Sequence, residues 1–347
     1  MSAVVVFIIF AICLVIAIPI SISLGIVAVL PGAFDASFTA SAGYVIRSMV
    51  GGIDSFPLLA VPMFVLAGIL MAHGKISEKL FDVFVYFLGN KRAGIPCAVI
   101  ITCLFYGAIS GSAPATVAAV GSMTIPLLIE LGYEKDFSTA IVAVAGGLGV
   151  IIPPSIPFIM YAMATGESVS DLFLAGIVPG MMISALLIFY AYYYCRRHGE
   201  DREKIQAKMD QLKTKGFVNI LKESIWALLS PVIVLGCIYS GVASPTEAAV
   251  ISVFYSLFVS LFIYKSIKVK QIWGIMVEAM KTYAPILFIL ATSTAFSRVL
   301  TLMQVPQDVS AWIMTHFSNE IVLLLVINVV LLIVGMVMDT TPAILIL

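Results

Sequence analysis

Long apolar stretches without charged residues recur along the whole chain and restrict its fold more than any other feature. The stretches 172–195 and 321–338 contain no Asp, Glu, Lys or Arg. A helix needs about 20 apolar residues to cross a hydrocarbon core about 30 Å thick, and both stretches are near that length. Only 11% of the 347 residues are charged, whereas an average soluble domain has about 25%. A water-exposed surface cannot be built from so few charges, so we predict an all-α polytopic membrane protein.

Apolar segments of varied length fill the rest of the chain. They run over 3–30, 56–72, 95–109, 113–131, 138–163, 172–195, 225–241, 248–264, 284–295 and 321–338. Several are too short to cross a bilayer alone, and many are interrupted by Gly, Pro or Ser. Within a bilayer, non-helical backbone is tolerated only where protein or trapped water satisfies its polar groups. The interruptions therefore indicate a polar cavity inside a helical bundle.

The charge balance and the reactive side chains exclude several other functions. Lys plus Arg equals Asp plus Glu at 19 each, so we expect no nucleic-acid partner. The five cysteines lack the spacing of metal ligands and are interpreted as small buried apolar residues. The three histidines lie far apart, which gives no support for a metal cluster or an enzymatic site.

One hydrophilic segment, 196–223, divides the chain. It carries eight Lys or Arg residues against five acids. A short loop this basic is expected on the cytoplasmic side of the membrane. A second basic group, Lys265, Lys268 and Lys270, follows after two short apolar spans, which would return the chain to the same side.

Weak internal similarity links the two halves of the sequence. Gly107, Pro114 and Ala115 match Gly335, Pro342 and Ala343 at a constant offset, since 335 − 107 = 228. Corresponding interrupted segments in two halves are typical of a transporter binding site. We therefore expect a first repeat at 1–195, a basic cytoplasmic connecting segment at 196–223, and a second repeat at 224–347. If the second repeat matched the first in length, roughly 65–85 residues would follow Leu347.

Two stretches of the first half carry the chemistry. The first, 110–116, is a group of small and hydroxylated residues inside an apolar run, and its alternative interpretation is a packing site or a helix kink. The second, 146–157, has three glycines and three prolines in the sequence GGLGVIIPPSIP, which cannot sustain a regular helix. The carbonyls left free before Pro153 and Pro154 must find partners. A sodium ion suits them, because carbonyls of unwound helices coordinate Na⁺ in secondary transporters.

Charged residues of the second half leave alternatives open. Asp339 is placed to join a second cation site, to hold a helix end, or to pair with Arg298. Arg298 itself either faces a cavity, where it would meet a carboxylate, or extends toward the membrane interface. Glu247 follows Ser244 and Pro245 and is interpreted as a helix-capping acid.

These motifs resemble a known family. The stretches 107–123, 147–161, 244–249 and 335–346 are similar to the large membrane subunit of tripartite ATP-independent periplasmic (TRAP) transporters, of the DctM/SiaM type. The pair GLGVIIPPS and MDTTPA is specific for this family, and the resemblance covers essentially the whole chain. The counterpart of 147–157 in the second half is missing, so site residues there cannot be named.

The resemblance implies an elevator-type importer in the bacterial inner membrane, in which a mobile domain with two re-entrant helical hairpins slides against a scaffold. It implies sodium as the coupling ion and an organic acid, such as a C4-dicarboxylate or sialic acid, as the substrate. It also implies two partners: a small four-helix membrane subunit of the DctQ/SiaQ type and a periplasmic substrate-binding protein of the DctP/SiaP type.

The resemblance also implies roles for individual residues. The expected sodium ligands are Gly107, Ser110, Gly149, Ile152, Pro154, Gly335, Met338 and Thr340. The residues expected near the substrate are Ser112, Pro114, Thr116, Ser155, Asp339 and Arg298.

Rival functions are weaker. A stand-alone carrier of the divalent-anion/sodium symporter type would need no binding protein. An intramembrane hydrolase would need a base near Ser110 or Ser112, and no His or Lys is placed in the apolar segments near them. A passive channel fits two broken half-sites less well than a carrier does.

Overall fold

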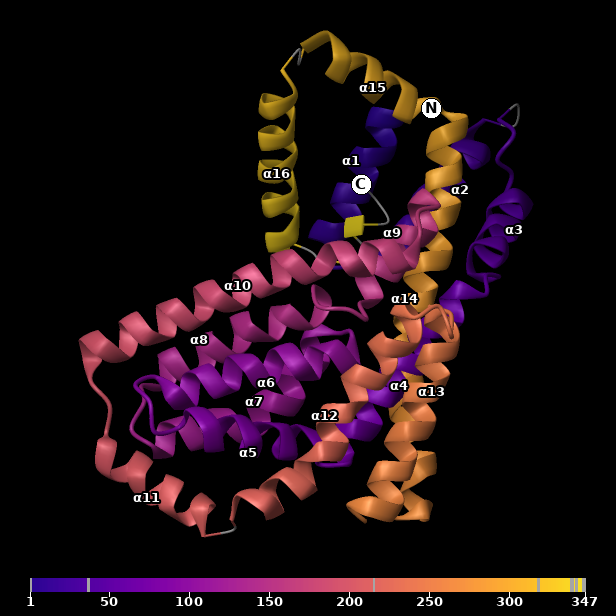
Figure 1. The fold of residues 1–347 in the computed structure, drawn as a ribbon. Helices are drawn as coiled ribbons and strands as arrows, with labels where there is room; N and C mark the ends of the chain where they lie inside the picture. Colours follow the sequence, from indigo (N-terminus) through magenta and orange to yellow (C-terminus); the bar gives the residue numbers. More distant parts are fainter. Residues whose placement is uncertain are drawn as a thin grey trace. The chain divides into compact units, whose positions relative to one another are not determined.

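The computed structural model describes residues 2–35, 38–214, 216–316, 319–337, 340 and 343–344. Within these residues all regular structure is helical, as predicted (Figure 1). Five helices are long and apolar enough to cross a membrane, or six if Ala42–Ile53 and Pro57–His73 form one broken span. The prediction of an all-α polytopic membrane protein is confirmed.

The chain divides into two compact units, Leu59–Met280 and Met1–Leu58 with Lys281–Leu347. We call them the central unit and the terminal unit. These units group residues that lie together in space, and such grouping does not test for sequence repeats. The predicted boundaries of the two repeats therefore stay a prediction.

The terminal unit is built from both ends of the chain. Its helices are α1 (Ala3–Val15), α2 (Ile20–Phe34), α3 (Ala42–Ile53), the part of α14 (Val269–Leu302) from Lys281 onward, α15 (Val305–His316) and α16 (Glu320–Val337). Its core joins α1, α2, α3 and α14, and Phe10 stacks on Phe296 with ring centroids 6.2 Å apart.

The central unit contains the other helices. These are α4 (Ala60–His73), α5 (Ile76–Leu88), α6 (Gly94–Ser110), α7 (Ala113–Glu130), α8 (Lys135–Gly146), α9 (Ile156–Thr165), α10 (Val169–His198), α11 (Arg202–Lys213), α12 (Phe217–Tyr239) and α13 (Pro245–Phe258), with short turns η1 (Pro57–Leu59, shared with the terminal unit), η2 (Gly147–Val150) and η3 (Val259–Ile263). Helices α5, α6, α7 and α8 pack side by side around its largest core (Figure 1).

Local sequence sets where these helices begin. Ser244 starts α13 with a capping box, in which its side chain accepts from the Glu247 N–H and Glu247 accepts from the Ser244 N–H at 2.7 Å. This arrangement satisfies two backbone donors that the helix itself leaves unpaired. The interpretation of Glu247 as a capping acid is confirmed.

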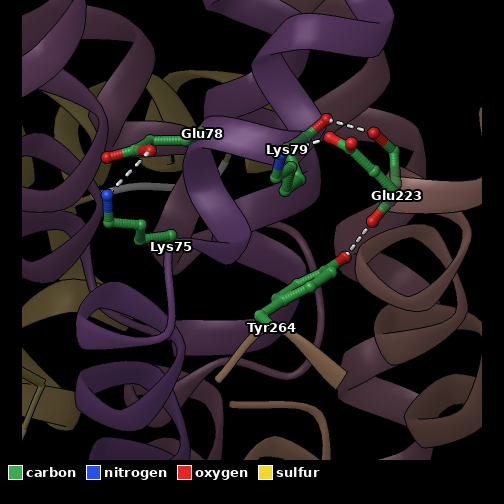
Figure 2. Close-up of polar contacts among 6 residues, drawn as sticks. Lys75, Glu78, Lys79, Glu223 and Tyr264 are labelled. Carbon is green, nitrogen blue, oxygen red and sulfur yellow. Dashed lines mark hydrogen bonds and ion pairs between the residues drawn. The ribbon is translucent and has the colours of Figure 1, made fainter. Parts of the chain in front are cut away.

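Polar contacts fasten α5 to α12 at one end of the central unit. Lys79 pairs with the Glu223 carboxylate, and the Ser224 hydroxyl donates to the Lys79 carbonyl at 2.9 Å. The Tyr264 hydroxyl donates to the Glu223 carbonyl, as Figure 2 shows. Glu223 belongs to the first turns of α12, so the hydrophilic segment 196–223 includes α11 and the beginning of a membrane helix.

Candidate functional site

The first interruption predicted from the sequence separates α6 from α7. Helix α6 ends at Ser110, and Gly111 follows with φ of +62°, a conformation that glycine adopts without strain. Ser112 then caps α7 and accepts from the Ala115 N–H at 3.5 Å. Pro114 sits in the first turn, where no helical donor is lost. The small and hydroxylated residues at 110–116 thus form a helix break.

The second interruption lies between α8 and α9. Helix α8 ends at Gly146, η2 follows, and the chain is non-helical until Ser155 caps α9. The Ser155 hydroxyl accepts from the Phe158 N–H at 3.3 Å and donates to the Val150 carbonyl at 2.6 Å. The prediction that this Gly/Pro-rich stretch is not a regular helix is confirmed, and Ser155 provides a partner for one carbonyl freed by the prolines.

Both new helices therefore start with the same device, a serine cap followed two residues later by proline. Ser112 precedes Pro114, and Ser155 precedes Pro157. The first backbone N–H groups of a helix give its N-terminus a partial positive charge. The serine caps already accept from the Ala115 and Phe158 N–H groups, so these two ends offer a nearby anionic group chiefly the partial positive charge of the helix dipole.

The two breaks are in direct contact. The Ile156 N–H donates to the Gly111 carbonyl at 3.2 Å. A methyl group on Gly107 would lie 2.6 Å from the Cα of Gly149, so only glycine allows α6 and η2 to approach so closely. A methyl group on Gly149 would lie 2.4 Å from the Thr116 hydroxyl and 2.9 Å from the Ser112 carbonyl. Residues from both stretches thus meet at one place.

A cluster of oxygen atoms occupies this place. The Ser110 and Thr116 hydroxyls lie 3.0 Å apart, and the Thr116 hydroxyl donates to the Ser112 carbonyl at 2.9 Å. Ser110 and Thr116 are 1% and 0% exposed. These oxygens are uncharged, and hydroxyl and carbonyl oxygens each have two lone pairs, so they retain acceptor capacity beyond these bonds. Oxygen-only donor sets are what hard cations prefer.

The structure brings together most of the site residues predicted in the first half. Gly107, Ser110 and Gly149 contact one another or Thr116 and Ser112, as described above. Pro154 is buried, and its carbonyl would lie 2.9 Å from a methyl group on Gly111. Ile152 is also buried, and its side chain packs against Gly180 of α10. Because an aliphatic side chain has no donor atom, only its backbone is available as a ligand. Pro114 is exposed on the first turn of α7.

The residues predicted in the second half belong to the terminal unit. Gly335 lies in α16 and is exposed, and Thr340 is exposed as well. Arg298 is exposed on α14, and its guanidinium lies beside Gly51 of α3. Met338 and Asp339 lie outside the described residues. The roles expected for these residues stay predictions.

Two residues that the sequence did not single out also belong to the site. The Tyr106 hydroxyl donates to the Gly68 carbonyl of α4 at 2.9 Å. A methyl group on Gly68 would lie 3.1 Å from the Cβ of Ser110. A tyrosine hydroxyl within an apolar stretch needs a buried partner, and this need was the available signal for Tyr106. A single glycine inside a helical pattern gives only a weak signal of close packing.

Comparison with known proteins identifies the family. Residues 7–347 match the family described as the tripartite ATP-independent periplasmic transporter, DctM component. The chain is 40% identical over 97% of its length to the isethionate TRAP transporter permease protein DctMQ of Oleidesulfovibrio alaskensis. It is 38% identical over 85% of its length to the C4-dicarboxylate TRAP transporter large permease protein DctM of Pseudomonas aeruginosa. A 2,3-diketo-L-gulonate TRAP transporter large permease protein of Escherichia coli is 36% identical over 87% of the chain.

The match covers different shares of these relatives. The chain spans about half of the isethionate permease (52%) and 67% and 69% of the other two. All three are permease proteins, so the expectation of a transport protein rather than an enzyme holds. Together with the apolar helices, these matches establish that the chain is an inner-membrane protein of the DctM component family of tripartite ATP-independent periplasmic transporters.

Proposed function

We propose that this protein is the large permease subunit of a sodium-coupled importer of a small organic acid. The observation that carries the proposal is the meeting of two helix breaks around the buried hydroxyls of Ser110 and Thr116 and the carbonyl of half-buried Ser112. Broken helices deep in the bilayer persist where they serve a binding site, because their unpaired backbone groups are otherwise costly.

The oxygen cluster is the proposed first sodium site. Its oxygens are close together and uncharged, and the Ser110 and Thr116 hydroxyls are buried, so the cluster suits a monovalent cation. Backbone carbonyls near Gly107, Gly149, Ile152 and Pro154 would complete the coordination. Residues Gly335, Met338 and Thr340 are proposed to contribute to a second sodium site.

The substrate class follows from the paired helix N-termini and from the relatives. Helices α7 and α9 begin next to each other, and both ends favour negative charge. Isethionate, C4-dicarboxylates and 2,3-diketo-L-gulonate, which the relatives' names give, are all small organic anions. We propose that an acid group binds near Ser112, Pro114, Thr116 and Ser155, with Asp339 and Arg298 near the substrate from the second half.

We further propose that the protein works with two partners and by an elevator movement. The family's description names a tripartite system, and a periplasmic binding protein and a small membrane subunit would be the other two parts. The hairpin of α6 and α7 would travel with the substrate. A stand-alone symporter has less support, because a tripartite family implies further components.

The test is uptake into proteoliposomes that contain this protein and the small subunit, with the binding protein outside. We expect uptake of the organic acid only with an inward sodium gradient and only when the binding protein is present. Uptake without a sodium gradient contradicts sodium coupling, and uptake without the binding protein favours the stand-alone carrier.

The site itself is tested by Ser110→Ala, which removes one buried oxygen. We expect the sodium concentration for half-maximal uptake to rise about tenfold or more, since loss of one hydrogen-bonding or ligating group costs about 1–3 kcal/mol. Ser122→Ala is the matched control, because Ser122 lies on α7 and is exposed. Unchanged sodium dependence in Ser110→Ala would remove this residue from the sodium site.

A further inference from the structure

We propose that Gly68 and Tyr106 are positioning residues. They fix Ser110 against helix α4 and thereby set the distance from the sodium ion to the Ser110 hydroxyl. The proposal rests on the sodium coupling proposed above. Neither residue supplies a side-chain ligand, and both act through Ser110.

The first observation is the approach of α4 to the end of α6. A methyl group on Gly68 would lie 3.1 Å from the Cβ of Ser110 and 3.2 Å from its Cα. Contacts this short are tighter than normal carbon–carbon packing at about 3.5–4.0 Å. The missing side chain of Gly68 therefore lets the last residue of α6 rest directly on the α4 backbone.

The second observation is the hydrogen bond from the same α4 residue to α6. Tyr106 is fully buried, and its hydroxyl donates to the Gly68 carbonyl at 2.9 Å. Tyr106 and Ser110 are four residues apart on one helix, so both lie on the same face. Gly68 thus contacts two successive turns of α6, one through a hydrogen bond and one through close packing.

An adjacent side of α6 is held as well. Gly107 is packed against Gly149 of η2 at a distance that excludes any side chain. The last turn of α6 therefore contacts both α4 and η2, which restricts the movement of Ser110. Ser110 provides one of the clustered oxygens. A shift of its Cα by a few tenths of an ångström would therefore change the distance from the ion to the Ser110 hydroxyl.

This role differs from ordinary packing in what it predicts. A residue that only stabilises the fold would change the amount of active protein, and hence the maximal uptake rate. A residue that positions Ser110 would change the sodium concentration needed for half-maximal uptake, even when the protein is correctly folded.

The experiment compares Gly68→Ala and Tyr106→Phe with wild type in the proteoliposome assay, with sodium varied at saturating substrate. We expect the half-maximal sodium concentration to rise about tenfold for Gly68→Ala and about threefold for Tyr106→Phe, which loses one neutral hydrogen bond. Sodium-dependent thermal stabilisation of the purified protein is a second readout, since an ion that binds only the folded state raises its stability. Both variants should need more sodium than the wild type for the same increase in unfolding temperature.

Matched controls are available within the central unit. Gly236→Ala adds the same methyl group to α12, where it would meet nothing within 4 Å. Tyr255→Phe removes a comparable hydroxyl that donates to the Trp226 carbonyl at 2.6 Å. Both controls should keep the wild-type sodium dependence, and Tyr255→Phe should lower thermal stability only.

The outcomes separate the two proposals. If wild-type uptake and stability do not respond to sodium, the proposed sodium coupling fails and the positioning role fails with it. If the wild type responds and both variants match it, only the positioning role is wrong. Should Gly68→Ala fail to fold, Tyr106→Phe decides the matter through the same two readouts.

Discussion

At the scale of single residues, the central unit depends on a few buried polar groups that join distant segments. Glu200, just after α10, has a side chain that is 2% exposed. Its carboxylate accepts from the Ala93 N–H at 3.0 Å, the Tyr133 hydroxyl at 2.7 Å and the Arg202 guanidinium at 2.9 Å. One carboxylate thus connects the turn before α6, the turn before α8 and the start of α11.

This arrangement predicts a large loss of stability for Glu200→Ala. The substitution leaves the Ala93 N–H and the Tyr133 hydroxyl without their acceptor, which we expect to cost about 3 kcal/mol of unfolding free energy. The measurement is the midpoint of thermal unfolding in detergent. Glu203→Ala, an exposed acid on the first turn of α11, is the control and should leave the midpoint within a degree or two. An equal effect of both variants would show that charge, and not the buried hydrogen bonds, matters here.

At the scale of helices and turns, the sequence predicted the features that local chemistry determines. The break at 146–157 follows from proline and glycine alone, and the start of α13 follows from Ser244 and Glu247. The resemblance places Gly107 and Gly149 together among the expected sodium ligands, but their direct contact needed the structure, because the two residues lie far apart in the chain. The same holds for Gly68 and Tyr106, whose partners lie on another helix and leave no trace in spacing or periodicity.

The cap of α11 predicts a pH effect at this scale. Asp201 accepts from the Lys204 N–H at 3.2 Å, and this hydrogen bond to the backbone of Lys204 is the main cause that holds the pKa of the Asp201 carboxyl below its usual range. The cap is therefore fully formed above the unfolded pKa of about 3.9 and is lost as pH falls through the lower folded value.

We expect amide hydrogen exchange in α11 to increase as the pH falls below the unfolded pKa of about 3.9, after correction for the intrinsic pH dependence of exchange. Asp201→Asn keeps a capping side chain without a titratable group, so its α11 should show no such increase. A similar rise in both proteins would place the titrating group elsewhere.

At the scale of the whole molecule, composition and segment order predicted the class of protein and the family membership confirms it, but the two-repeat organisation stays a prediction. The first half carries its site residues close together in one compact unit. The proposed partners of the second half, Met338 and Asp339, lie outside the described residues, and Gly335 and Arg298 belong to the terminal unit. Membrane orientation is likewise a property of the whole chain, and the basic segment 196–223 is the feature that predicts it.

The orientation is tested by labelling a single cysteine in α11. Gln211 is exposed, and basic segments stay on the cytoplasmic side because Lys and Arg are translocated poorly. In a background with Cys237, the one native cysteine that is not buried, changed to alanine, Gln211→Cys should react with a membrane-impermeant maleimide in inside-out vesicles and not in intact spheroplasts. Labelling in detergent gives the total, and Gln211→Ser gives the background. Because α10 and α12 both adjoin this segment, a strong signal from intact spheroplasts would reverse the orientation that the basic segment predicts for the central unit.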